Sequence, residues 1–478
     1  MAFSEFCARS GGSNLNSGTR TGSSTVPGVA ADLTYALGNW VAATGVFTVI
    51  AADPVADGVA VGDFASVYAD GSTVTGFVGR VTARTITTIT VSLSAKSGTA
   101  PTDGTGTRTL KIGGAWKGPN GAEAFPFGFV TAALTNSAAD DIRVNLKNDA
   151  NYSITAAMSH SVAGPVVFQG FAASYGDAGR ATIDGGTTGA SYILLTVSNV
   201  SQHQYADIKF QNNGATGSAT GVVIAGGGAN GRTLINRCVF SDLRGRGLEV
   251  GSGAGNCVIE CEAFGCNQSN TALLAGFHLT SCILAARCIS HDNTGSNAIG
   301  FAIAHCHLQS CIADSNGSYG FWADATAGML LIRCDSYNNG SDGLRDNVSG
   351  TSILYYIESC NFIKNGGYGI NASVTGTTPS GRIVNCGFGS GTQANTSGQT
   401  NGLNSIDVAG SITYAANTSP WTDPANGDFR ISLAAAKGTG RGTYTQTAAS
   451  YAGTLGYPDI GAAQSLASGG GVILIEDD

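Results

Sequence analysis

The chain has 478 residues, a length that suits two or three ordinary domains or one long solenoid. Glycine contributes 70 residues, charged residues only 12% and hydrophobic residues 42%, which excludes a disordered linker because disorder requires low hydrophobicity and high net charge. The net charge of −8, with 24 scattered Lys and Arg residues, argues against nucleic acid as a partner, and no apolar run reaches the roughly 20 residues of a membrane helix.

Residues 1–37 form an N-terminal segment that begins MAFSEFCARSGG. This start has neither a basic region nor an apolar core, so we expect synthesis in the cytoplasm without a classical signal peptide. Residues 38–113 include VGDFASVYADGSTVTGFVGRVTARTITTITVSLS, which alternates polar and apolar residues with period two and carries tight-turn signals. This stretch predicts a small antiparallel β-barrel or sandwich inserted near the N-terminus.

Residues 114–410 contain a repeat that is most regular in its second half. Its cysteines are separated by 23, 27, 23, 23, 26 and 26 residues, and a period in the twenties indicates a solenoid. The cysteine column consists of Cys238, Cys261, Cys288, Cys311, Cys334, Cys360 and Cys386. Each cysteine is preceded, three residues earlier, by an apolar residue, and a glycine turn later leads into a short strand such as GLEV or GFWA. One coil is thus strand, Asn/Gly turn, strand, and the sequence predicts an all-β, right-handed parallel β-helix.

A second column lies five residues after the cysteines and consists of Asn293, Asn316, Asn339 and Asn365. In a β-helix, equivalent residues of adjacent coils stack about 4.8 Å apart, so each column becomes a physical ladder. We expect the asparagines to occupy tight turns, because Asn tolerates left-handed backbone and its amide can bond along the stack. The residues just before the cysteines, such as Arg237, Glu260 and Arg287, are expected to point outward as an ion-pair ladder.

The cysteine ladder admits three interpretations, of which buried packing is favoured over disulfides and over a metal site. A metal site would need cysteine pairs or histidines that converge on one point, and Cys306 and Cys311 beside His305 and His307 come nearest to this. We assign no metal and no cofactor. Free thiols in this number also favour assembly in a reducing cytosol.

Several stretches resemble the pectate-lyase-like family of right-handed parallel β-helix proteins. DDIRVNLKNDANYSI and GPVVFQGF resemble the family's first coils, the C-x-F…N-x-G-x-G pattern resembles its repeat, and DPANGDFRISL and YPDIGAAQ resemble its C-terminal segment. The resemblance covers most of residues 114–464. It implies the fold, whereas activity stays open because the architecture hosts lyases, hydrolases, phage tailspikes, adhesins and inert structural proteins.

The resemblance also places a candidate site on the strand that follows each glycine turn. In the family's lyases, acids on successive rungs of an exposed strand hold calcium, but in this chain the outward positions do not stack acids. Glycoside hydrolysis would need two carboxylates about 5 to 10 Å apart, for which Asp324 with Asp346 or Asp342 is the available choice; solvated acids are the favoured interpretation. We therefore name no catalytic residue. The candidate carbohydrate-binding residues are Trp322, Asp324, Arg345 and His278.

Residues 411–468 form a closing segment, and residues 469–478 form a tail in which a glycine run precedes Val472, Ile473, Leu474 and Ile475. These four apolar residues would be an aggregation hazard unless buried. The tail is either a connector that pairs with a neighbouring subunit or a cap on the chain's own last coil.

Together these features predict a non-enzymatic structural or adhesive protein of an extracellular assembly, with a bacteriophage virion appendage or decoration protein as the favoured setting. We expect a homo-oligomer or larger assembly, with surface polysaccharide as a further partner, and neither nucleic acid nor membrane insertion. A tailspike-like polysaccharide lyase or glycoside hydrolase and a bacterial adhesin are the alternatives.

Overall fold

The computed structural model describes residues 3–13, 16–18, 26–28, 30–72, 77–119, 126–127, 141–161, 163–198, 201–225, 232–251, 255–271, 274–280, 282–323, 329–346, 354–371, 380–389, 405–409, 412–413, 421–423 and 428–431. These residues form strands and turns, and they include no apolar helix of membrane-spanning length. The chain divides into two compact units. The first comprises Met1–Thr187, Tyr192–Gln211 and Asn230–Cys238, and the second comprises Thr188–Ser191, Asn212–Ala229 and Val239–Asp478.

The first unit contains a closed antiparallel barrel with the strand order β2-β3-β6-β5-β4-β7. Its strands are β2 (Leu33–Val41), β3 (Val46–Thr48), β4 (Phe64–Ala69), β5 (Phe77–Arg84), β6 (Thr88–Gly98) and β7 (Gly104–Ile112). Alternate residues point inward, so that Trp40, Phe47 and Phe77 are buried in its core. Because β2 pairs with β7, the barrel leaves no open edge.

The barrel is an insertion between strands of the β-helix. The short strand β1 (Phe3–Arg9) precedes it and pairs in parallel with β8 (Trp116–Lys117) and β9 (Asp141–Lys147), which follow it. The N-terminal strand therefore belongs to the β-helix, a role that its sequence alone did not reveal.

The coils of the first unit place their strands in three parallel sheets, here called sheets I, II and III in the order in which a coil visits them. Sheet I has the order β18-β15-β12-β9-β1-β8, sheet II has β10-β13-β16 and sheet III has β11-β14. The additional strands are β10 (Tyr152–Ser153), β11 (Met158–His160), β12 (Ala163–Phe171), β13 (Ala181–Asp184), β14 (Leu195–Val197), β15 (Ser201–Ala206), β16 (Ile208–Gln211) and β18 (Thr233–Asn236).

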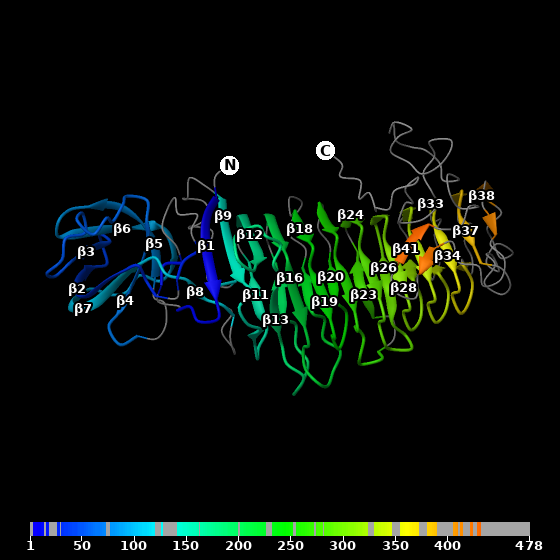
Figure 1. The fold of residues 1–478 in the computed structure, drawn as a ribbon, viewed down its shortest axis with the longest axis horizontal. Helices are drawn as coiled ribbons and strands as arrows, with labels where there is room; N and C mark the ends of the chain where they lie inside the picture. The colour runs from blue at the N-terminus through cyan, green and yellow to red at the C-terminus, as the bar shows by residue number, and fades with distance from the viewer. Residues whose placement is uncertain are drawn as a thin grey trace. The chain divides into compact units, whose positions relative to one another are not determined.

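The coils of the second unit repeat the same three-sheet arrangement, and Figure 1 shows their strands side by side in green to orange. Sheet I holds β21 (Asn256–Ile259), β24 (Cys282–Ala286), β27 (His307–Gln309), β30 (Met329–Ile332), β33 (Leu354–Glu358), β36 (Ser380–Val384) and β38 (Ser405–Ala409). Sheet II holds β19 (Val239–Ser241), β22 (Glu262–Phe264), β25 (Ile289–His291), β28 (Ile312–Asp314), β31 (Asp335–Tyr337), β34 (Asn361–Ile363), β37 (Gly387–Phe388) and β39 (Ile412–Thr413). Sheet III holds β17 (Val222–Ile224), β20 (Leu248–Val250), β23 (Ala275–Leu279), β26 (Ile299–Ile303), β29 (Phe321–Ala323), β32 (Leu344–Asp346) and β35 (Ile370–Asn371).

Strands of each sheet pair in parallel with the equivalent strand one coil away, as β26 does with β23 and β29. The prediction of an all-β, right-handed parallel β-helix with a small inserted antiparallel barrel is therefore confirmed. A separate antiparallel hairpin is formed by β40 (Trp421–Asp423) and β41 (Asp428–Ile431).

Each regular coil turns at two residues that have a left-handed backbone conformation, with positive φ, and these residues are here called corners. The first corner is the residue before the ladder cysteine, and the second is the residue before the ladder asparagine. The first set has φ between 49° and 56° and comprises Arg237, Glu260, Arg287, Ser310, Arg333, Ser359 and Asn385. The second set includes Asp292, Ser315, Asn338 and Lys364. The expectation that the column asparagines themselves adopt the left-handed turn is thus wrong, because the preceding residue takes that conformation.

Candidate functional site

The outward column of sheet III is the candidate site that the sequence indicates. The strand register places His278 beside Glu249 on one side and Ala302 on the other, and then Trp322, Arg345 and Asn371 follow at successive rungs. Trp322 and Arg345 are therefore neighbours, whereas His278 lies two rungs from Trp322. Asp324 lies outside the described residues.

Among the described residues of this column, Glu249 carries the carboxylate, and other residues of the fold already bind it. Its Oε2 accepts hydrogen bonds from Nη1 of Arg246 at 2.8 Å and from Oγ1 of Thr220 at 3.3 Å. Its Oε1 lies 3.8 Å from Nδ1 of His278. His278 and Arg246 together lower the pKa of Glu249 to about 2, against the effect of its partial burial. A group that stays ionised in this way cannot serve as a general acid near neutral pH.

A second polar cluster is centred on the buried carboxylate of Asp342, in the turn that precedes β32. Its Oδ2 lies 3.4 Å from Nη1 of Arg345 and accepts a hydrogen bond of 2.9 Å from Nδ2 of Asn371. Its Oδ1 accepts a bond of 2.7 Å from the backbone N of Tyr368. Asp342 thus joins two coils. The interpretation of Asp342 and Asp346 as solvated acids is wrong, because both are buried.

The side chain of Trp322 is packed against its neighbours and is not accessible at the surface. Its side chain is 5% exposed and contacts Ala302 and Ile299, and its ring centroid lies 4.9 Å from that of Tyr319. His278 is similarly covered, at 7% exposure. A sugar that stacks on an aromatic side chain needs an open ring face. Of the described candidate residues, Arg345 keeps the larger accessible share, with a quarter of its side chain exposed.

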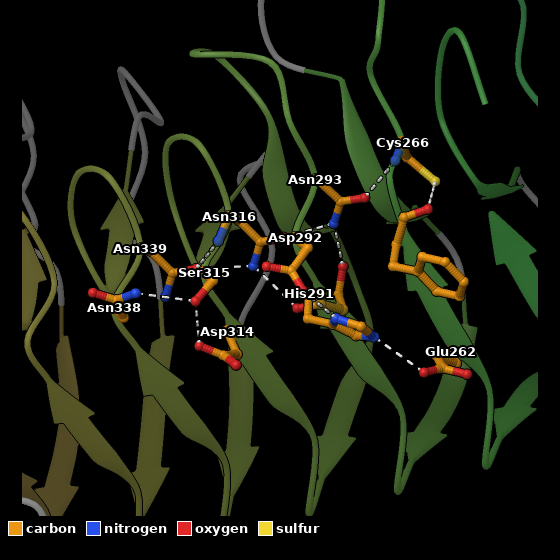
Figure 2. Close-up of polar contacts among 12 residues, drawn as sticks. Glu262, Cys266, His291, Asp292, Asn293, Asp314, Ser315, Asn316, Asn338 and Asn339 are labelled. Atoms are coloured by element: carbon orange, nitrogen blue, oxygen red, sulfur yellow. Dashed lines mark hydrogen bonds and ion pairs between the residues drawn. The ribbon is translucent and has the colours of Figure 1, made fainter. Parts of the chain in front are cut away.

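The asparagine column forms a continuous amide ladder in the second unit, which Figure 2 shows from Asn293 to Asn339. Nδ2 of Asn293 donates to Oδ1 of Asn316 at 2.6 Å, and Nδ2 of Asn316 donates to Oδ1 of Asn339 at 2.8 Å. Nδ2 of Asn339 donates in turn to Oδ1 of Asn365 at 2.8 Å. All four side chains are buried. Each amide also bonds backbone groups, as when Oδ1 of Asn339 accepts from N of Asn316 at 3.0 Å. The ladder therefore satisfies polar groups of the coil corners that would otherwise be buried without partners.

The cysteine column runs through the interior without disulfides. All seven of its members are free and buried. Their thiols make long hydrogen bonds to backbone carbonyls, such as Sγ of Cys311 to O of Ala285 at 3.4 Å. Burial raises the pKa of Cys288 and Cys311 well above the ordinary thiol value. The thiols of Cys288 and Cys311 are therefore protonated, and the buried cysteines of the column act as small packing groups.

The predicted ion-pair ladder exists as separate pairs at the first corner. Arg287 Nε donates to Oε1 of Glu260 at 3.0 Å, and Arg237 makes two bonds of 2.7 Å to the carboxylate of Asp207. Both pairs link adjacent coils. The partly exposed pair of Arg287 and Glu260 contributes about 1 kcal/mol or less, whereas the carboxylate of Asp207 is buried beside Arg237.

The sequence did not predict a charged cluster on sheet II, which Figure 2 shows beside the amide ladder. The ring of His291 lies between two carboxylates, with Nε2 3.0 Å from Oε1 of Glu262 and Nδ1 2.8 Å from Oδ2 of Asp292. The same ring stacks on Phe264 at 5.3 Å between centroids. The two carboxylates raise the pKa of His291 despite its burial. Because Glu262 and His291 come from coils of unequal length, no fixed sequence spacing predicts that they pair.

Asp314 follows His291 one rung further along sheet II. Burial, together with the nearby charge of Asp292, raises the pKa of Asp314 to about 6, while a hydrogen bond of 2.8 Å from Oγ of Ser315 opposes this shift. Asp314 is thus partly protonated near neutral pH. In the part of the chain that the structure describes, no set of three or more His, Cys, Asp or Glu side chains has the arrangement needed for a metal ion.

The predicted tail residues Val472, Ile473, Leu474 and Ile475 lie outside the described residues. The tail's role as connector or cap therefore stays a prediction.

No family model and no curated protein matches the sequence. Among solved structures, the chain is similar to pectate lyase Pel9A, with 17% identity, coverage of 69% of this chain and 89% of that chain, and a TM-score of 0.49. It is similar to the A-module of mannuronan C-5 epimerase AlgE4 of Azotobacter vinelandii, with 16% identity, 60% and 83% coverage and a TM-score of 0.42. It is also similar to ORF18 of Geobacillus virus E2, with 13% identity, 62% and 60% coverage and a TM-score of 0.31. The sheet topology of the chain itself is that of a parallel β-helix.

Proposed function

We propose that this chain is a non-enzymatic structural or adhesive β-helix protein of an extracellular assembly, with a bacteriophage virion appendage or decoration protein as its setting. The observation that carries the proposal is that the carboxylates of Glu249 and Asp342 on the sheet III face are already bound by other groups of the protein. Glu249 is held ionised by His278 and Arg246, and Asp342 is held by Arg345, Asn371 and a backbone N–H. These carboxylates stabilise the coil stack, and their oxygens are occupied by the protein itself.

The thiols support a setting in which the chain folds before it leaves the cytoplasm. All 12 cysteines are free, and a protein that folds in an oxidising compartment rarely keeps so many unpaired thiols. A virion protein, which assembles in the cytosol and acts outside the cell, fits this condition better than a secreted bacterial adhesin does. A homo-oligomer or larger protein assembly is the proposed partner.

Surface polysaccharide is the proposed target of the adhesive role, with Arg345 as the contact residue that the fold leaves most accessible among the described candidates. A planar guanidinium donates several hydrogen bonds in a fixed geometry, which suits sugar hydroxyls and carboxylates. The covered ring of Trp322 would need to be exposed before it could add stacking.

The test measures binding and breakdown of polysaccharide in the same reaction. The full-length protein is incubated with purified surface polysaccharides, and both co-sedimentation and the appearance of new reducing ends or unsaturated uronates are followed. We expect retention without breakdown, and weaker retention by Arg345→Ala than by the surface control Arg84→Ala. Breakdown that Glu249→Gln abolishes would overturn the non-enzymatic proposal.

The tailspike-like glycoside hydrolase remains the second candidate, and Asp314 is the observation that favours it. A carboxyl group whose pKa is raised to about 6 has the property needed in a general acid near neutral pH. In the same assay, release of oligosaccharides that persists in Glu249→Gln but disappears in Asp314→Asn would establish this alternative and locate it on sheet II.

A further inference from the structure

Three of the four ladder asparagines are followed by glycine, in the pairs Asn316-Gly317, Asn339-Gly340 and Asn365-Gly366, whereas Asn293 is followed by Thr294. An Asn-Gly pair is chemically labile in a mobile chain, and asparagine is among the residues most prone to such damage. The backbone nitrogen of the glycine attacks the side-chain amide carbon and expels ammonia, which forms a succinimide. Water then opens this ring to aspartate or isoaspartate, with no oxidation or reduction.

After Asn316, Asn339 and Asn365, close stacking of the coils requires glycine in spite of this lability. A Cβ atom on Gly317 would lie 1.9 Å from the carbonyl oxygen of Gly295, and one on Gly340 would lie 2.3 Å from that of Gly317. No side chain fits at such distances from backbone atoms. The same turn holds asparagine, whose amide donates to one neighbour in the ladder and accepts from the other.

The fold holds both reacting groups in place. The attacking atom is occupied, since N of Gly340 donates to O of Asn316 at 2.8 Å and N of Gly366 donates to O of Asn339 at 2.7 Å. The attacked amide is occupied as well, since Nδ2 of Asn339 donates to O of Ala313 at 3.0 Å and to Oδ1 of Asn365 at 2.8 Å. Cyclisation needs the amide carbon to turn toward the next backbone nitrogen. Several of these bonds must break first.

We propose that Asn316, Asn339 and Asn365 are latent deamidation sites that the folded ladder suppresses and that unfolding exposes. In the intact coils, the amides persist for as long as the ladder stays closed. Once the coils open, the same three residues convert to aspartate or isoaspartate. The folded stack therefore retains its three amides, and each period spent unfolded converts more of them to aspartate or isoaspartate. This behaviour does not depend on whether the protein binds carbohydrate.

Conversion prevents the ladder from re-forming. An aspartate at position 339 has no Nδ2 donor, so its oxygens would face the carbonyl oxygen of Ala313 and Oδ1 of Asn365, which are both acceptors. Burial of such unpaired oxygens is strongly unfavourable. An isoaspartate adds one carbon to the main chain, which moves the following glycine out of its contact with the preceding coil.

The test compares deamidation in the folded and unfolded full-length chain. Both samples are held in mildly alkaline buffer, one without and one with urea, and peptide mass mapping follows amide loss at each site over time. We expect loss at Asn316, Asn339 and Asn365 to be at least about tenfold slower in the folded chain, because local opening must precede reaction. Asn293 serves as the internal control, since Thr294 makes its cyclisation slow in both states. Equal rates at the three sites in both states would overturn the proposal.

A second measurement tests the consequence. Urea is removed from unfolded samples after increasing times, and the fraction that regains native strand content is compared with the fraction that keeps all three amides. We expect the two fractions to fall together. Asn339→Asp should refold poorly, whereas Asn338→Asp, which places the same charge at the adjacent exposed position, should refold like the parent chain. Full refolding of deamidated chains, or of Asn339→Asp, would contradict the proposed one-way loss.

Discussion

The inner columns repeat one residue type from coil to coil, whereas the outer face of sheet III changes its residue type at each rung. In the inner columns, one residue type repeats at each coil, as with Asn316, Asn339 and Asn365, because each amide takes its own equivalent as its partner. On the outer face, the residue type changes at each rung from Glu249 to His278 to Ala302, and the polar contacts involve different neighbours each time. A sequence period therefore reports the interior of the coils, and it carries no information on what the outer face binds.

The largest expected effect comes from breaking the amide ladder at its centre. Asn339→Ala removes the acceptor for the backbone N of Asn316 and the donors to O of Ala313 and Oδ1 of Asn365. We expect the free energy of unfolding to fall by about 3 kcal/mol, since several buried groups lose partners together. Urea unfolding followed by circular dichroism measures this. The control Asn338→Gly removes one bond at an exposed position and keeps a residue that accepts the left-handed backbone, so it should change the free energy by less than about 1 kcal/mol.

The cysteine ladder should give the next largest effect. Cys311→Ala leaves a small cavity between Cys288 and Cys334, and we expect a loss of about 1–2 kcal/mol in the free energy of unfolding. Because the thiols are unpaired, a reductant should not shift the unfolding midpoint of the parent chain. A midpoint that falls when reductant is added would reveal disulfides between coils and refute the packing role.

Asp314 belongs to the same coils as the ladders but lies outside them, so its substitution measures how much a residue outside the ladders contributes to stability. Its pKa of about 6 in the folded chain lies above the ordinary value of 3.8, so the folded state binds the proton more tightly than the unfolded state. Its contribution to stability is present at acid pH and is lost as the pH rises from about 4 through 6. Asp314→Asn should raise the free energy of unfolding at pH 7 by about 1 kcal/mol, after allowance for solvent screening, and flatten this part of the profile. An unchanged profile would show that the neighbourhood of Asp314 does not alter its ionisation.

The smallest expected effect belongs to Glu249 on the outer face. Its folded pKa of about 2 lies below the ordinary value of 4.5, so its contribution is present above about pH 4.5 and is lost as the pH falls toward 2. Since the side chain is partly exposed, Glu249→Gln should reduce the free energy of unfolding at pH 7 by less than about 1 kcal/mol. Acid titration of both chains checks the sign. A stability gain in the variant at neutral pH would mean that Glu249 is strained, as an active-site acid can be.

The fold was predictable because stacking turns sequence columns into contacts. The cysteine and asparagine spacing located the coils, and period-two alternation located the barrel. Three features were not predictable from local patterns. The membership of β1 in the β-helix depends on pairing across the whole barrel. The left-handed corners fall on residues as different as Arg287 and Ser310, and the burial of Trp322 depends on Ile299 and Ala302 from the neighbouring coil. The His291 cluster was missed because the lengths of successive coils differ.

The central claim is that the inner ladders stabilise the coils more than Glu249 of the outer face does. The most direct test is the difference in free energy of unfolding between Asn339→Ala and Glu249→Gln, measured in one buffer at pH 7 with the same probe. We predict that Asn339→Ala is less stable than Glu249→Gln by about 2 kcal/mol or more. Equal losses, or a larger loss for Glu249→Gln, would contradict the claim.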